Sequence, residues 1–213
     1  MAVFAVAGAA AVAASPPAFH SLVQPVPSYL QAQMKGDTWH PGCPVPLSQL
    51  RVLRVTYWDF DGHVRTGGLV TNRSSTEPLR RVFRRLYALR FPIHAMSLDD
   101  IYGVRRKHPK IVDQTGSFEC RDAVASPCPG TSPTHHWSMH AYGEAIDVNP
   151  IENPYTGCGI TRTKASIPYL DRSRLRKGMV TPAVVAAFRS VGLGWGGDWT
   201  GTKDYMHFSV NGH

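Results

Sequence analysis

Two stretches in the first half of the chain, residues 50–60 and 63–71, alternate apolar and polar positions as paired strands do. They flank Asp61-Gly62, a dipeptide that favours a tight two-residue turn. The pattern therefore predicts an antiparallel β-hairpin. Arginines then interleave with apolar residues over positions 79–87, after a Thr-Glu-Pro start at residues 76–78. This spacing predicts an amphipathic helix with its basic face outward.

The remaining apolar runs are shorter. A short strand is expected near residues 92–96 and a second helix near residues 182–191. Thr181 can cap that helix and Gly192 can end it. Glycine (19) and proline (17) are frequent, which indicates many turns. Together these features predict a mixed α+β fold.

The C-terminal half contains two further segments with strand-like alternation, residues 144–149 and 205–210. Alternation puts Asp147 on a polar face of the first segment and His207 on a polar face of the second, while their apolar neighbours face a core. Two adjacent strands could then present Asp147 and His207 side by side. His140, from the loop before, would complete a triangle.

These residues belong to two short motifs, residues 138–147 and 204–207, which together supply two imidazoles and two carboxylates. Three such groups can bind a metal ion and the fourth can act as acid or base, as a zinc peptidase requires. Asp204 must lie in the turn that enters its strand if it is to bend toward the site. A single histidine is more often a surface or packing residue, and His135 and His136 are expected to be structural.

The two motifs, S-x-H-x-x-G-x-A-x-D and D-x-x-H, resemble those of the M15 zinc peptidases. These are the D-alanyl-D-alanine carboxypeptidases and L-alanyl-D-glutamate endopeptidases. The similarity includes residues 117–121, 149–155 and 194–199, and spans approximately residues 40–210 in one order. It implies an α+β fold in which a small, mainly antiparallel sheet is backed by helices and zinc lies in a cleft on the sheet.

The resemblance also implies roles for individual residues. Three would be the protein ligands of one Zn²⁺ ion per chain: His140, Asp147 and His207. Asp204 would be the general base that moves a proton from water to the leaving amine. Arg121 would stabilise the oxyanion of the tetrahedral intermediate, a role that suits a fixed cation. Ser138 would fix either a ligand or the substrate.

The substrates that the resemblance implies are peptidoglycan peptides. The sequence does not decide which of two peptide bonds is cut, D-Ala-D-Ala or L-Ala-D-Glu. The Asp-type last motif looks closer to the endopeptidase branch, whereas the general family label is D-Ala-D-Ala carboxypeptidase. An alternative is a non-catalytic, zinc-containing domain that binds cell wall or protein; the Hedgehog signalling domain looks similar in this region. A third reading is a secreted structural domain held by disulfides. The presence of Asp204 favours the peptidase, which is expected to be a monomer.

Length and charge narrow the picture further. At 213 residues and 43% hydrophobic composition, residues 26–213 can form one domain with a sizeable core. The net charge of +8 comes partly from the arginines of positions 80–85, which by default form a solvated face. No nucleic-acid partner is expected, because no recognisable binding module is present. Attraction to an anionic cell wall is a hypothesis consistent with this charge.

Residues 1–25 are expected to be an apolar leader or signal-like segment. Residues 2–14 are rich in alanine and Ala11-Val-Ala13 suits a cleavage site, although no basic residue precedes the run. The run is too short to span a bilayer, and no other segment is apolar enough. We therefore expect an exported protein, extracellular or associated with the cell wall.

Four cysteines fit an oxidising compartment, and their even number allows three pairings. Cys120 with Cys128 would pin the loop that carries Arg121. Cys43 with Cys158 would tie the N-terminal segment to the site region. Free buried thiols are the alternative, and at least one disulfide is favoured.

Overall fold

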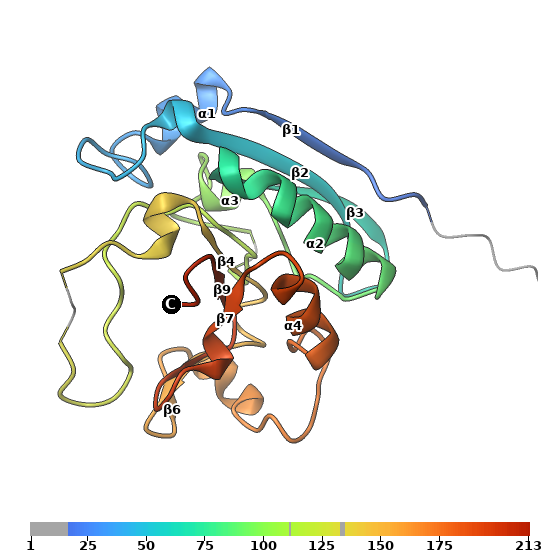
Figure 1. Cartoon of the computed structure of the whole chain (residues 1–213), viewed down its shortest axis with the longest axis vertical. Helices are drawn as coiled ribbons and strands as arrows, with labels where there is room; N and C mark the ends of the chain where they lie inside the picture. Colours follow the sequence, from blue (N-terminus) through green and yellow to red (C-terminus); the bar gives the residue numbers. More distant parts are fainter. Residues whose placement is uncertain (1–16, 111, 133–134) are drawn as a thin grey trace, which may run out of the picture.

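The computed structural model describes residues 17–110, 112–132 and 135–213 (Figure 1). Its first sheet is antiparallel, with the order β1-β2-β3. The strands are β1 (Ser21–Pro25), β2 (Leu50–Trp58) and β3 (Val64–Asn72). Strands β2 and β3 confirm the predicted hairpin.

The hairpin turn is longer than the two residues predicted. Trp58 pairs with Val64, so the turn spans residues 59–63. The Asp59 carboxylate accepts hydrogen bonds from the backbone N–H groups of Asp61 and His63, at 2.9 and 2.8 Å. This side chain stabilises a wider loop than a two-residue turn would provide.

Helix α2 (Thr76–Ala88) is the predicted arginine-rich helix, and it packs across the first sheet (Figure 1). Its apolar face is buried in a core shared with β2 and β3. Arg81, Arg84 and Arg85 are exposed, whereas Arg80 pairs with Glu77 at 2.7 Å. The basic face is therefore outward, as predicted.

Helix α4 (Pro182–Arg189) confirms the second predicted helix, although it ends two residues earlier than expected. The Thr181 hydroxyl accepts a hydrogen bond from the Val184 N–H at 3.4 Å, which caps the helix start. Phe188 stacks on Phe208 of the C-terminal sheet, with ring centroids 3.7 Å apart. Helices α2 and α4 thus enclose one core with the strands.

The other helical segments are short: α1 (Ser28–Met34), α3 (Leu98–Ile101), η1 (Leu47–Gln49), η2 (Arg73–Ser75), η3 (Met139–Tyr142), η4 (Lys164–Tyr169) and η5 (Gly196–Asp198). Among the described residues, no helix is long and apolar enough to cross a membrane. The strand predicted near residues 92–96 is wrong. Pro92 makes one isolated bridge with Trp58 and lacks the N–H that a ladder needs.

Two smaller antiparallel sheets complete the fold. One has the order β4-β9-β7, and the other β6-β5-β8. Their strands are β4 (Ala145–Asp147), β5 (Tyr155–Gly157), β6 (Ile160–Thr161), β7 (Gly194–Trp195), β8 (Lys203–Asp204) and β9 (His207–Ser209). The predicted α+β class with a small antiparallel sheet is confirmed. The strands are divided among three sheets, however, and not gathered in one.

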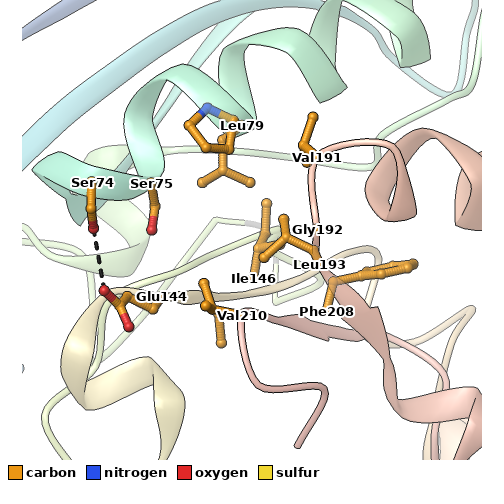
Figure 2. A pocket seen from close by; sticks show the side chains of 12 residues that line it. Ser74, Ser75, Leu79, Glu144, Ile146, Val191, Gly192, Leu193, Phe208 and Val210 are labelled. Atoms are coloured by element: carbon orange, nitrogen blue, oxygen red, sulfur yellow. Dashed lines mark hydrogen bonds between the residues drawn. The ribbon is translucent and has the colours of Figure 1, made fainter.

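The apolar faces of β4 and β9 point into the core, where Ile146 and Phe208 are buried. Beside them, an apolar cavity of about 240 Å³ lies between the start of α2 and the loop after α4 (Figure 2). Leu79 and Leu193 also line it. Because neighbouring residues of a strand face opposite ways, the other side of β4 and β9 is left for polar groups.

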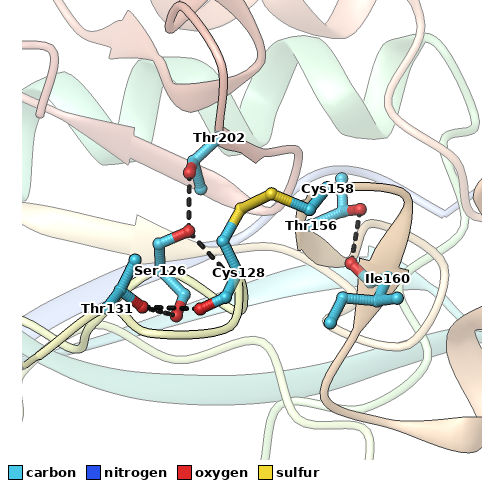
Figure 3. Close-up of a disulfide and its surroundings, with 7 residues drawn as sticks. All are labelled: Ser126, Cys128, Thr131, Thr156, Cys158, Ile160 and Thr202. Carbon is cyan, nitrogen blue, oxygen red and sulfur yellow. Dashed lines mark hydrogen bonds between the residues drawn. A yellow bond between two sulfur atoms is a disulfide. The ribbon is translucent and has the colours of Figure 1, made fainter.

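Two disulfides join Cys43 to Cys120 and Cys128 to Cys158, which confirms that disulfides form. Of the three pairings that the sequence left open, the structure does not contain Cys120 with Cys128 and Cys43 with Cys158. The Cys120 N–H donates to the Thr38 carbonyl at 2.9 Å, which brings Cys120 to the N-terminal segment. Figure 3 shows Cys128 beside the turn after β5. Long-range packing, rather than closeness in sequence, therefore selects the pairs.

The first sheet begins earlier than the domain boundary expected at residue 26. Residues 21–25 form β1 and pair with β2, so they belong to the folded domain and not to a leader. Residues 1–16, which contain most of the predicted leader, lie outside the described residues. The N-terminal end of the folded part is thus a paired strand.

Candidate metal centre

His140 is positioned by the short helix η3 and its two ends. The Ser138 hydroxyl accepts a hydrogen bond from the His140 N–H at 3.3 Å and caps the helix start. Gly143 ends it with a φ of 66°, and a Cβ at this position would lie 2.6 Å from the Asn72 nitrogen. Only glycine suits both the conformation and the close approach. Ser138 and Gly143 therefore fix where His140 stands.

Strands β4 and β9 place Asp147 directly opposite His207. His140 Nε2 lies 3.1 Å from His207 Nδ1 and 3.3 Å from Asp147 Oδ1, and His207 Nδ1 lies 3.2 Å from the same oxygen. The three predicted ligands thus converge on one point with three donor atoms. Both histidines are buried, and Asp147 is partly exposed.

The hydrogen bonds behind the two imidazoles show which nitrogen carries each proton. His140 Nδ1 donates to the Ser117 carbonyl at 2.6 Å, and His207 Nε2 donates to the His213 main-chain oxygen at 3.3 Å. In the neutral histidines, Nε2 of His140 and Nδ1 of His207 then point lone pairs at each other and at Asp147. Three acceptors around one point favour a cation, and metal-bound histidines commonly donate their far N–H in this way.

The two imidazoles and the Asp147 carboxylate shift the pKa values within this cluster. Burial alone would raise the pKa of Asp147, but His140 and His207 outweigh it and hold that pKa well below its usual range. Burial works to lower the pKa of His140, yet the Asp147 carboxylate raises it overall. Asp147 therefore stays ionised and is available as a ligand across the neutral range.

Asp204 lies in strand β8, opposite Tyr155, and not in a free turn as expected. Burial, and after it the negative charge of Asp147, raises the pKa of Asp204 to about 7. Its Oδ1 is buried, and no hydrogen-bond partner reaches this atom within the described ranges. A carboxyl group with this pKa can exchange a proton near neutral pH.

The triangle and Asp204 open onto a cleft of about 290 Å³. Arg121 lines it, with Nε donating to Glu119 at 2.8 Å and Nη1 to the Asp122 carbonyl at 3.1 Å. These contacts hold the guanidinium at the wall of the cleft. Among the described residues, no hydrogen bond or ion pair joins Arg121 to the triangle, so its role stays a prediction.

Sequence reasoning missed several residues of this cleft. His136, expected to be structural, lines it, as do Val124, Asn211 and His213. Trp199 also lines the cleft and packs on His207, with ring centroids 5.6 Å apart. Trp199 lies in the segment 194–199 that resembles M15 peptidases, but the other positions carry no motif. They reach the cleft because the C-terminal segments and the loop before η3 meet only in the folded chain.

Residues 131–210 match the family model described as D-alanyl-D-alanine carboxypeptidase, an M15 peptidase family. Over these residues the chain is similar to the M15 peptidases. The match includes the triangle and Asp204, whereas Arg121 lies outside it. No curated protein and no solved structure matches the chain. This similarity agrees with the His–Asp–His cluster, whose two histidines are buried and whose three donor atoms could hold a metal ion.

Proposed function

We propose that this protein is a zinc-dependent M15 peptidase that hydrolyses peptide bonds in peptidoglycan stem peptides. The observation that carries the proposal is the triangle of His140, Asp147 and His207 beside the buried carboxyl of Asp204, all at one cleft. His and Asp donors suit zinc, which is commonly held by three protein ligands in catalytic sites. A binding domain would have no need for the fourth, buried carboxyl group.

His140 Nε2, Asp147 Oδ1 and His207 Nδ1 would hold the zinc ion. When bound, zinc lowers the pKa of a water molecule and polarises a carbonyl group. Asp204 would accept the proton of the attacking water and return it to the amine that leaves, since an amine leaves poorly without a proton. Its pKa of about 7 in the metal-free chain suits both directions of transfer.

Arg121 would stabilise negative charge on the substrate oxygen. The guanidinium is anchored by Glu119 and Asp122, so little reorganisation is needed during the reaction. Ser138 would act on His140 through its cap and not on the substrate. Trp199 would limit the freedom of the His207 ring. These residues complete the proposed machinery around the triangle.

The substrate class is supported by the family match and by the compartment. Two disulfides are typical of exported proteins, as an enzyme acting on the cell wall would have to be. The net charge of +8 favours approach to an anionic wall polymer. Release of D-alanine would identify a carboxypeptidase, and release of longer peptides an endopeptidase.

The test is hydrolysis of purified muropeptides with and without a chelator, followed by mass spectrometry of the fragments. Asp204→Asn should lower kcat/KM by about 100- to 10,000-fold while bound zinc is unchanged. Asp198→Asn is the matched control, since its side chain is half exposed and pairs with Arg189. Full activity of Asp204→Asn with zinc bound would refute the mechanism, and activity insensitive to the chelator would refute zinc dependence.

A further inference from the structure

A second cluster of histidine and carboxylates, formed by His94, Asp113 and Glu152, is not used by the proposed peptidase mechanism. His94 Nδ1 lies 2.8 Å from Asp113 Oδ2 and 3.9 Å from Glu152 Oε1. One donor atom from each residue lies within 4.8 Å of the others. The three side chains therefore face one point, as metal ligands do.

The two carboxylates are buried and incompletely satisfied. Asp113 is 2% exposed and Glu152 is 3% exposed. His94 Nδ1 and Asp113 Oδ2 face each other at 2.8 Å, and Tyr169 lies beside the Glu152 carboxyl. Even so, neither of these two atoms, nor Glu152 Oε2, makes a well-aligned hydrogen bond within the described part of the chain. Buried polar atoms whose hydrogen bonds are incomplete are costly, so binding of a cation here is one physical explanation for them.

The electrostatics of the cluster agree with this explanation. Burial, and after it the neighbouring Asp113, raises the pKa of Glu152 to about 8. Two adjacent buried carboxylates cannot both be ionised without a nearby cation. The competing explanation needs no metal: Glu152 keeps a proton, and the His94 ring pairs directly with Asp113.

We propose that His94, Asp113 and Glu152 form a second site for a divalent transition-metal ion. One imidazole nitrogen and two carboxylate oxygens are ligands that Zn²⁺ and Mn²⁺ accept, whereas Ca²⁺ prefers oxygen alone. The His94 ring is packed on Phe60, with centroids 4.7 Å apart, and its side chain is 37% exposed. The donor atoms are thus pre-positioned beneath a side chain that is itself partly exposed.

The three ligands come from three segments that the fold already links. The His94 N–H donates to Asn149 Oδ1 at 2.9 Å, and the Ile151 N–H donates to Asp113 Oδ1 at 2.9 Å. Asn149 follows β4, the strand that carries Asp147. An ion at this site would link the segment after Asp147, which carries Glu152, to the segments that carry His94 and Asp113. We infer a structural role that supports the geometry of the peptidase site.

The experiment measures zinc bound per chain by elemental analysis, after equilibration with ZnCl₂ and removal of free ion. Wild-type protein should hold about two ions, and His94→Ala and His207→Ala should each hold about one. His94→Ala should also lower the melting temperature in zinc, but not in the presence of a chelator. This proposal rests on the proposed function only for its supporting role, and the His207→Ala variant tests the two proposals separately. Because this variant lacks a ligand of the triangle, any zinc that it still binds is at the second site.

An exposed group, formed by Asp59, Asp61 and His63, could also collect zinc. His63→Ala is therefore the matched control, and it should leave both ions in place. The proposal is overturned if the wild type holds one ion that disappears in His207→Ala. It is equally overturned if the extra ion is lost in His63→Ala and kept in His94→Ala. Glu152→Gln, checked for folding by circular dichroism, provides a second variant that should also lose one ion.

Discussion

The His140–Asp147–His207 triangle and the His94–Asp113–Glu152 cluster contain the same kinds of side chain, yet they differ in what surrounds them. The triangle has two imidazoles whose far N–H groups are fixed by carbonyls, and it opens onto a cleft of about 290 Å³. The second cluster has one imidazole and two buried carboxylates, beneath the Phe60 ring.

This difference teaches that donor atoms alone do not make a catalytic centre. Asp204 and Arg121 line the cleft of the triangle and add an acid–base group and a cation. The second cluster uses both of its carboxylates as candidate ligands, which leaves none to move a proton. A metal ion could bind at either site, but of these two clusters the triangle is the one that shares a cleft with a further carboxyl group and a guanidinium.

The largest expected effect is a loss of activity that occurs when the triangle is altered but not when the second cluster is altered. His207→Ala removes a proposed ligand from the triangle and should lower kcat/KM on muropeptides by at least about 1,000-fold. His94→Ala should retain most of the activity at saturating zinc, because the residue does not line the cleft. Steady-state kinetics on both variants checks this. If kcat/KM fell by similar factors in the two variants, the proposed difference in function between the clusters would be wrong.

A smaller effect is expected from the cation at the cleft wall. Arg121→Ala should lower kcat by about 100- to 1,000-fold, the size seen when one oxyanion donor is lost. Bound zinc should be unchanged, because Arg121 is not a proposed ligand. Arg189→Ala, an exposed arginine paired with Asp198, is the control. A loss of zinc together with activity in Arg121→Ala would instead assign the residue a structural role.

The turn that supports His140 gives a stability test. Gly143→Ala forces a side chain into a positive φ and toward the Asn72 backbone, and should cost about 2 kcal/mol of unfolding free energy. Gly159→Ala has a similar φ of 75° but meets no atom within 4 Å, so it should cost less. Denaturant unfolding measures both. Of the two variants, Gly143→Ala should bind zinc at the triangle more weakly, because this turn positions His140.

The smallest expected effect concerns pH. The folded, metal-free chain keeps a proton on Asp204 up to about pH 7, whereas the unfolded chain releases it near pH 4, so stability falls as pH rises between these values. Asp204→Asn should therefore raise the melting temperature by about 5 °C at pH 8 and hardly at pH 4. Scanning calorimetry with a chelator checks this. An equal change at both pH values would show that titration of Asp204 is not the cause.

Local patterns were sufficient for several elements. The hairpin, the arginine-rich helix α2 and helix α4 follow from alternation, helical spacing and caps, which depend on near neighbours. The two motifs likewise identified the residues that converge in the triangle, because their spacing is read along the chain. The strand predicted near residues 92–96 failed, since Pro92 interrupts pairing there.

The sequence by itself determined the fold class, the M15 motifs and the residues of the triangle. Tertiary structure alone decided the disulfide pairs, the strand that carries Asp204 and the carbonyls of Ser117 and His213 that orient the imidazoles. It also assembled His94, Asp113 and Glu152. The physical reason is distance along the chain. Periodicity and caps depend on residues a few positions apart, whereas these contacts join distant segments that only packing brings together.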